Sequence, residues 1–114
     1  MRAELKGVVS PDADVRTLDG RLESLLVQLM IGPAQGPGEE SFDAIACTPG
    51  WRARSVDPDD AEQNRYLIVL DRVDLASIEA YVREFLETLE RPTWIELAAE
   101  LDQIGKWEFL DYRP

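Results

Sequence analysis

Two alternating apolar runs near the middle of the chain constrain the fold more than any other feature. In residues 25–31, LLVQLMI, every second side chain is a bulky aliphatic one. In residues 41–48, SFDAIACT, Phe42, Ala44 and Ala46 alternate with Asp43, Ile45 and Cys47. A period of two over runs of this length is typical of β-strands with one buried face. The connecting GPAQGPG is rich in turn-forming residues, and Pro33 lacks the N–H that a continuing strand donates. We therefore predict two antiparallel neighbouring strands joined by a hairpin turn, the first ending at Gly32-Pro33.

The remaining patterns predict further strands and two helices. Residues 2–9 alternate apolar and charged positions, which predicts an edge strand with one wet face. Residues 66–70, YLIVL, form a continuous apolar run, typical of a strand buried on both faces. Apolar residues then recur at spacings of three and four over 75–89 and 94–104, which predicts two amphipathic helices. With a last strand after Gly105, we expect an α+β fold: an antiparallel-rich sheet of about five strands with two sequential helices packed on one face.

Both predicted helices carry start and stop signals. Asp74 is placed to cap the first helix, and Thr93 with Glu96 has the spacing of a capping box at the second. Pro92 ends the first helix, and Gly105 is expected as a left-handed cap after the second. The sequence therefore predicts both ends of each helix.

Length and composition indicate one domain over residues 1–114. A chain of 114 residues can bury a core without cross-links, and its one cysteine excludes an internal disulfide. The first ten residues contain charges and lack the apolar core of a signal peptide. No apolar run approaches the length of a membrane span. We expect a cytoplasmic protein.

The net charge of −11 is unevenly distributed. Residues 1–54 carry 6 basic and 8 acidic side chains, giving −2, whereas residues 55–114 carry 6 and 15, giving −9. Nucleic acids and anionic membranes are poor partners for such a chain, whereas a basic protein would be attracted by its field. The alternative is acidity that only maintains solubility.

Few residues are available for catalysis or metal binding. The absence of histidine excludes a histidine base, a Ser–His pair and a Cys/His zinc site. Cys47 lies on a predicted inner strand with no visible activating base, so we expect a buried, unoxidised thiol. Glu108 and Asp111 could form an acid–base pair, but an acidic chain contains many such pairs by chance. We expect no enzyme activity, no cofactor and no metal.

Acidic side chains gather in two predicted loops. Residues 55–64 carry four acids and no basic residue, which fits a solvated loop or a partner-binding loop. A calcium-binding EF-hand is excluded, because Glu62 and Ile68 occupy the positions that require Gly and a carboxylate. Trp51 borders the loop and is a candidate anchor, since aromatic residues dominate binding hot spots. The predicted partner-binding residues are Glu39, Glu40, Trp51, Asp57, Asp59, Asp60 and Glu62.

A rival surface is the polar face of the two helices, with Glu79, Glu87, Glu96 and Glu100. A helix exterior is more often plain solvated surface, which favours the loops. The other two tryptophans, Trp94 and Trp107, are predicted to pack between the helices and the sheet.

Five pieces of the sequence stand in a distinctive order: LMIGP, GEESFD, CTPGW, YLIVLDRVDLASIEAYV and TWIELAAELDQIGKWEFLDYR. Together they resemble the immunity protein 8 family of bacterial polymorphic toxin systems, over roughly residues 5–113. Such proteins are encoded beside a toxin, bind its C-terminal toxic domain and protect the producing cell. The resemblance implies inhibition by binding a cognate toxin domain, with no catalytic residues. Many toxins of these systems are nucleases with basic surfaces, which would match the charge.

Two other functions stay open from the residues alone. The first is a small acidic intracellular adaptor or binding module with no toxin partner, which an isolated gene would favour. The second is a carboxylate-dependent enzyme, whose acids would converge in one closed pocket instead of spreading over a convex face.

Overall fold

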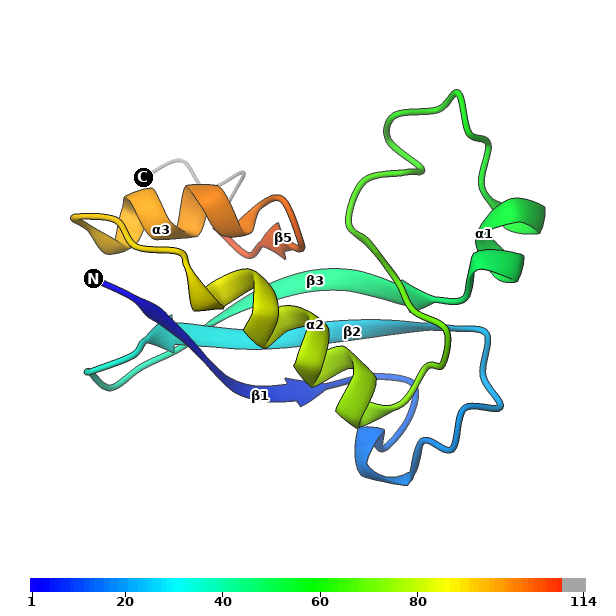
Figure 1. The fold of residues 1–114 in the computed structure, drawn as a ribbon, viewed down its shortest axis with the longest axis horizontal. Helices are drawn as coiled ribbons and strands as arrows, with labels where there is room; N and C mark the ends of the chain where they lie inside the picture. Colours follow the sequence, from blue (N-terminus) through cyan, green and yellow to red (C-terminus); the bar gives the residue numbers. More distant parts are fainter. Residues whose placement is uncertain (110–114) are drawn as a thin grey trace.

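The computed structural model describes residues 1–109, which form a five-stranded sheet with helices packed on it (Figure 1). The strands are β1 (Ala3–Val9), β2 (Ser24–Pro33), β3 (Glu40–Cys47), β4 (Leu67–Val69) and β5 (Lys106–Trp107). The helices are α1 (Pro49–Ser55), α2 (Leu75–Glu87) and α3 (Trp94–Leu101), and a short 3-10 helix, η1 (Val15–Thr17), lies between β1 and β2. The predicted α+β class is confirmed.

The antiparallel pair β2–β3 is the centre of the sheet, as predicted. Its register runs without interruption from Ser24 opposite Cys47 to Ile31 opposite Glu40. β1 pairs with the other side of β2 and forms an edge, also as predicted. The outer edge of β3 is shared by two short strands, because β4 runs parallel to its C-terminal part and β5 antiparallel to its N-terminal part. The sheet is therefore antiparallel-rich with one parallel pair.

One face of the sheet carries the hydrophobic core. In Figure 1, α2 lies across the front of the sheet and α3 lies above β3. Ile78 and Val82 of α2, with Leu97 and Leu101 of α3, are fully buried in the same cluster as the inward side chains of β2 and β3. The two predicted helices therefore cover one face. The inward side chains of β2 and β3 are Leu25, Val27, Leu29, Ile31, Phe42, Ala44 and Ala46.

The helix starts are capped as predicted, but both helices end earlier than the apolar pattern predicts, and α2 stops at Glu87. Asp74 accepts a hydrogen bond from the N–H of Ser77 at 2.8 Å, and the capping box of Thr93 and Glu96 forms in both directions. α3 ends at Leu101. The prediction that Gly105 is a left-handed cap is wrong, because its φ is not positive. Gly105 instead lies so close to Phe42 that an added Cβ would be 2.9 Å from the Phe42 Cβ.

Two other boundaries differ from the prediction. β2 continues through Pro33, which pairs with Ala3. A proline at the last position of a strand is tolerated where its N–H is not needed, and the next N–H, of Ala34, donates to the carbonyl of Arg2 at 2.9 Å. β3 ends before Thr48, because that residue is the N-cap of α1, a helix that the sequence patterns did not predict.

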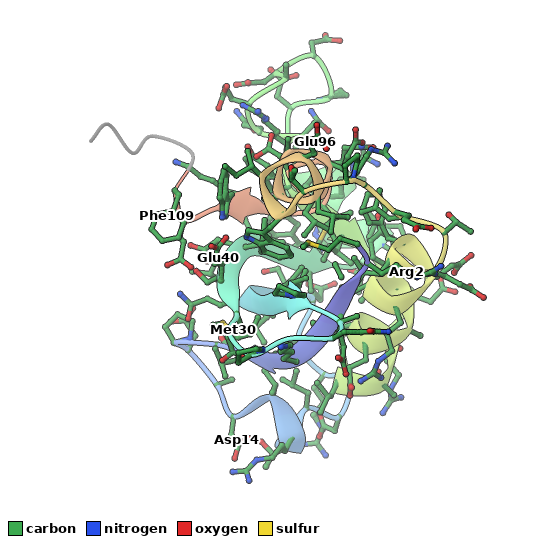
Figure 2. All side chains as sticks on the ribbon, turned by 90° about the vertical axis from the view of Figure 1, so that its left-hand side faces the viewer. Arg2, Asp14, Met30, Glu40, Glu96 and Phe109 are labelled. Atoms are coloured by element: carbon green, nitrogen blue, oxygen red, sulfur yellow. The ribbon has the colours of Figure 1, made fainter. Side chains whose placement is uncertain are left out.

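A single carboxylate ties α3 and β5 to β3. Oε2 of Glu40 accepts hydrogen bonds from the indole Nε1 of Trp94 at 2.9 Å and of Trp107 at 2.6 Å. Both indoles pack against the core, as predicted, and Trp107 stacks on Phe42 with ring centroids 6.5 Å apart. Figure 2 shows Glu40 on the sheet side of α3. The carboxylate of Glu40, a predicted partner contact, is thus engaged inside the protein.

We expect Glu40→Ala to lower the free energy of unfolding by about 2 kcal/mol, because two indole N–H groups lose a charged acceptor in a partly buried site. Urea unfolding followed by tryptophan fluorescence would measure this change. Glu39→Ala is the matched control, since Glu39 is exposed and surface substitutions change stability by less than about 0.5 kcal/mol. Equal effects of the two substitutions would show that the indole contacts contribute nothing.

Candidate functional site

The predicted site residues lie in two groups at opposite ends of β3 (Figure 1). Glu39 and Glu40 stand at the hairpin end, where β3 begins. Trp51 stands on α1, which follows the other end of β3. Residues 55–64, here named the acidic loop, begin at the last residue of α1. The structure therefore brings Trp51 and the acidic loop to one end of the molecule and leaves the hairpin acids at the other.

The acidic loop is held by hydrogen bonds to its own backbone. Oδ1 of Asp57 accepts from the N–H of Asp59 at 2.9 Å, and Oδ1 of Asp60 accepts from the N–H of Glu62 at 3.0 Å. The side-chain amide of Asn64 donates to the carbonyls of Asp57 and Asp60 at 2.7 and 2.8 Å. Aspartates that accept from the backbone two residues on are turn-forming. Asp57 and Asp60 therefore shape the loop as well as charging it.

The other two acids direct their charge outward. The carboxylate of Asp59 makes no hydrogen bond or ion pair with any side chain in residues 1–109. The side chain of Glu62 is 86% exposed and approaches Arg65 at 3.9 Å. An exposed pair at that distance contributes little energy, so Glu62 and Asp59 are both open to a partner.

The end of the acidic loop is anchored to the C-terminus of α3. Tyr66 has a φ of 62°, and its carbonyl accepts from the N–H of Ile45 at 2.9 Å. Its hydroxyl donates to Oδ1 of Asp102 at 2.9 Å, while Arg65 donates to Oδ2 at 3.0 Å. The Arg65 guanidinium also lies 4.9 Å from the centroid of the Tyr66 ring. Burial, followed by the Asp102 carboxylate, raises the pKa of Tyr66 to about 12.

Trp51 lines a hollow of about 420 Å³ on the sheet face that the core does not use. Leu26 and Ile45, paired across β2 and β3, point into it, and Leu22 completes its apolar lining. Asp12 stands among its polar lining residues. The sequence patterns did not assign Leu22, Leu26 or Ile45 to a site. A signal was present, because the alternation that buries Val27 and Ala44 turns Leu26 and Ile45 to the opposite face.

Most acids of the rival helix surface already have partners. Glu79 pairs with Arg83 at 2.8 Å, and Glu100 pairs with Arg91 at 3.2 Å. Glu96, which Figure 2 shows on the outer side of α3, completes the capping box of that helix. Glu87 is exposed, and no ion pair engages its carboxylate in the described part of the chain.

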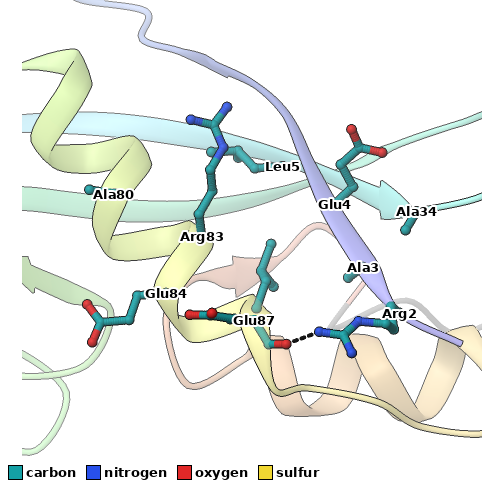
Figure 3. Close-up of a pocket in the computed structure, with 10 residues that line it drawn as sticks. Arg2, Ala3, Glu4, Leu5, Ala34, Ala80, Arg83, Glu84 and Glu87 are labelled. Carbon is teal, nitrogen blue, oxygen red and sulfur yellow. Dashed lines mark hydrogen bonds between the residues drawn. The ribbon is translucent and has the colours of Figure 1, made fainter.

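A groove of about 690 Å³ lies between β1 and α2 (Figure 3). Its charged lining mixes both signs, and both of its arginines are engaged. The Arg2 guanidinium donates to the backbone carbonyl of Glu87, and Arg83 is paired with Glu79. Glu4 and Glu84 add two carboxylates without a base or nucleophile beside them. The groove therefore offers no convergent set of catalytic groups.

Other candidates for chemistry are used in the fold. Cys47 is fully buried, as predicted, and burial raises the pKa of its thiol against a smaller opposing effect of Arg52. The Glu108 carboxylate accepts from the N–H of Ser41 at 2.7 Å, while its predicted companion Asp111 lies outside the described residues. Among residues 1–109 there is no group of three or more Cys, Asp or Glu side chains that could hold a metal ion. No helix in that range has the length and apolarity to cross a membrane.

The family model described as Immunity protein 8 matches residues 3–112, almost the entire chain. The chain belongs to the immunity protein 8 family. Searches of curated proteins and of solved structures found no match. Membership of the immunity protein 8 family indicates an immunity protein of a toxin system and implies binding of a cognate toxin. Proteins of this kind are generally not enzymes.

The Tyr66–Asp102 contact makes a testable pH prediction for this immunity protein 8 family member. The pKa of the Tyr66 hydroxyl is raised from 10.0 to about 12, so the folded protein favours its protonated form. The protonated Tyr66 hydroxyl contributes its full stabilisation below pH 10.0, the pKa of an unfolded tyrosine. This stabilisation is lost as the pH rises from 10.0 to about 12, the pKa of Tyr66 in the folded protein. Absorbance titration of the folded protein should show a late tyrosine phase that Tyr66→Phe removes.

Tyr81→Phe is the control, since it changes an exposed tyrosine on α2. It should leave the late phase intact. A late phase that persists in Tyr66→Phe would contradict the assignment.

Proposed function

We propose that this protein binds and neutralises the toxic C-terminal domain of a cognate polymorphic toxin, protecting the bacterium that produces both. The observation that carries the proposal is the family match over residues 3–112. The protein acts by occupying the toxin domain in the cytoplasm, as one domain, with no catalytic residue, metal or cofactor of its own.

Charge supports a basic partner. The net charge is −11, and residues 55–114 contribute −9 of it, from 6 basic and 15 acidic side chains. Complementary charge raises association rates and helps a protein to select its partner. A toxin domain with a basic surface, as a nuclease has, fits this charge.

The partner contact that we propose is centred on Trp51 and the acidic loop. Its charged members are Asp57, Asp59, Asp60 and Glu62. An aromatic anchor beside a charged rim is a usual interface layout. The loop is supported by its internal hydrogen bonds, so a partner would not need to order it first.

The hairpin acids take different roles in this proposal. Glu39 is exposed and provides a second, electrostatic contact at the far end of β3. Glu40 contributes through stability, because its carboxylate is occupied by Trp94 and Trp107.

Co-expression tests the function directly. Cells that express the toxin domain encoded beside this gene should survive when this protein is also expressed and die when it is not. Purified toxin domain should form a one-to-one complex with the protein. Cells that die equally in both cases would overturn the immunity function for that pair.

Charge reversal tests where the toxin binds. We expect Asp59→Lys with Glu62→Lys to slow association about tenfold at low salt and to flatten its salt dependence, because both carboxylates face outward. The melting temperature should stay nearly unchanged, since neither side chain shapes the loop. Stopped-flow mixing with the toxin domain measures the rate.

Glu84→Lys with Glu87→Lys is the matched control, because it changes the net charge by the same amount on the exposed side of α2. This control should reduce the rate far less. If the control slows association more than Asp59→Lys with Glu62→Lys does, the toxin binds at the helices and not at the acidic loop.

A further inference from the structure

The uncovered face of the sheet is apolar near α1, where a solvated face would be polar. Antiparallel sheets with one wet face usually alternate apolar side chains inward with polar ones outward. Here Leu26 pairs with Ile45 on the outward face, and its side chain is 39% exposed. On the next strand Val9, opposite Gln28, is 47% exposed on the same face. Leu26 and Val9 therefore expose apolar surface to water on this face, and no other element within residues 1–109 covers them.

The hollow gives this surface a shape. Leu22, from the loop before β2, is 43% exposed, and Trp51 forms a wall from α1. Together with Leu26 and Ile45 they line a space of about 420 Å³. Single exposed apolar residues are ordinary, and Ile95, 70% exposed on α3, is one. The hollow differs because apolar side chains from a loop, two strands and a helix converge there.

Charges around the hollow leave a net negative field. The basic side chains of residues 10–23 and of α1 are already engaged within the protein, whereas the Asp12 carboxylate, at the hollow, has no ion pair in the described chain. Across α1, Asp59 is likewise unpaired and Glu62 nearly so. Three of these arginines are offset by carboxylates, Arg16 by Asp14, Arg21 by Asp19 and Arg54 by Glu23. Arg52 donates to the neutral amide of Asn64 and keeps its charge, but the acids of this region outnumber it.

We infer that the hollow receives an apolar side chain of the toxin domain, flanked by Lys or Arg side chains that meet Asp12 and the acidic loop. This inference rests on the proposed function and deepens it by naming the docking surface and the chemistry of the partner. Charge complementarity selects the occupant, because an acidic second copy of the chain would be repelled by the same field. A few side chains buried in well-packed pockets near the centre of an interface carry most of its binding energy.

The test is the affinity of Leu22→Gln with Leu26→Gln for the purified toxin domain encoded by the neighbouring gene. These changes keep the net charge and shape nearly constant and remove only apolar contact. We expect about 100-fold weaker binding, roughly tenfold for each side chain. Ile95→Gln, the same change at an exposed apolar residue away from the hollow, should alter the affinity by less than about twofold. Circular dichroism and urea unfolding verify that each variant is folded.

The outcomes separate the docking surface from the function. Wild-type protein that binds and protects, with the double variant equally active, would overturn the docking surface and leave the function standing. Wild-type protein that neither binds nor protects would overturn both. A wild-type dimer that dissociates in the double variant would assign the hollow to a second copy and overturn the inference. If the double variant does not fold, Leu22→Gln alone, in a loop, provides the same test.

Discussion

The uninterrupted ladder between β2 and β3 holds the other parts of this protein in place. Its inward side chains form the floor of the core on which α2 and α3 pack. At one end of β3, Glu40 binds the indoles of α3 and β5. At the other end, Thr48 caps α1 directly after the last paired residue. A shift of this register by one residue would exchange the two faces and disconnect the core, the indole contact and the hollow together.

The parts of this fold that the sequence predicts are those with local signals. Period-two alternation predicts β2 and β3, and the capping residues Asp74 and Thr93 predict the starts of α2 and α3. The start of α1 also carries a capping signal, an N-cap Thr48 followed by Pro49 at the first helical position. Gly50 directly after them is typical of a turn, so the pattern did not predict a helix. The parallel placement of β4 and the sharing of one edge with β5 depend on contacts between distant segments, which no local pattern contains.

The candidate site, too, has parts that the sequence predicts and parts that only the folded structure shows. Composition identifies the acidic loop, because four acids stand there without a basic residue. It does not separate Asp57 and Asp60, which accept hydrogen bonds from the loop backbone, from Asp59 and Glu62, which face outward. Nor does it distinguish Glu39 from Glu40, although only the second meets two indoles. These distinctions depend on side-chain direction, and direction is fixed only after the chain has folded.

In the described part of the chain, neither side of the sheet offers a long, regular, unpaired strand, and this limits how other chains can bind the protein. A long unpaired edge strand recruits further strands through its backbone and so promotes aggregation. Here β1 has a register shift between Leu5 and Gly7, and β3 is covered along its outer side by β4 and β5. Strand addition is therefore discouraged at either side. A protein that binds this domain therefore has to recognise its side chains, whose identity can change while the sheet that carries them stays the same.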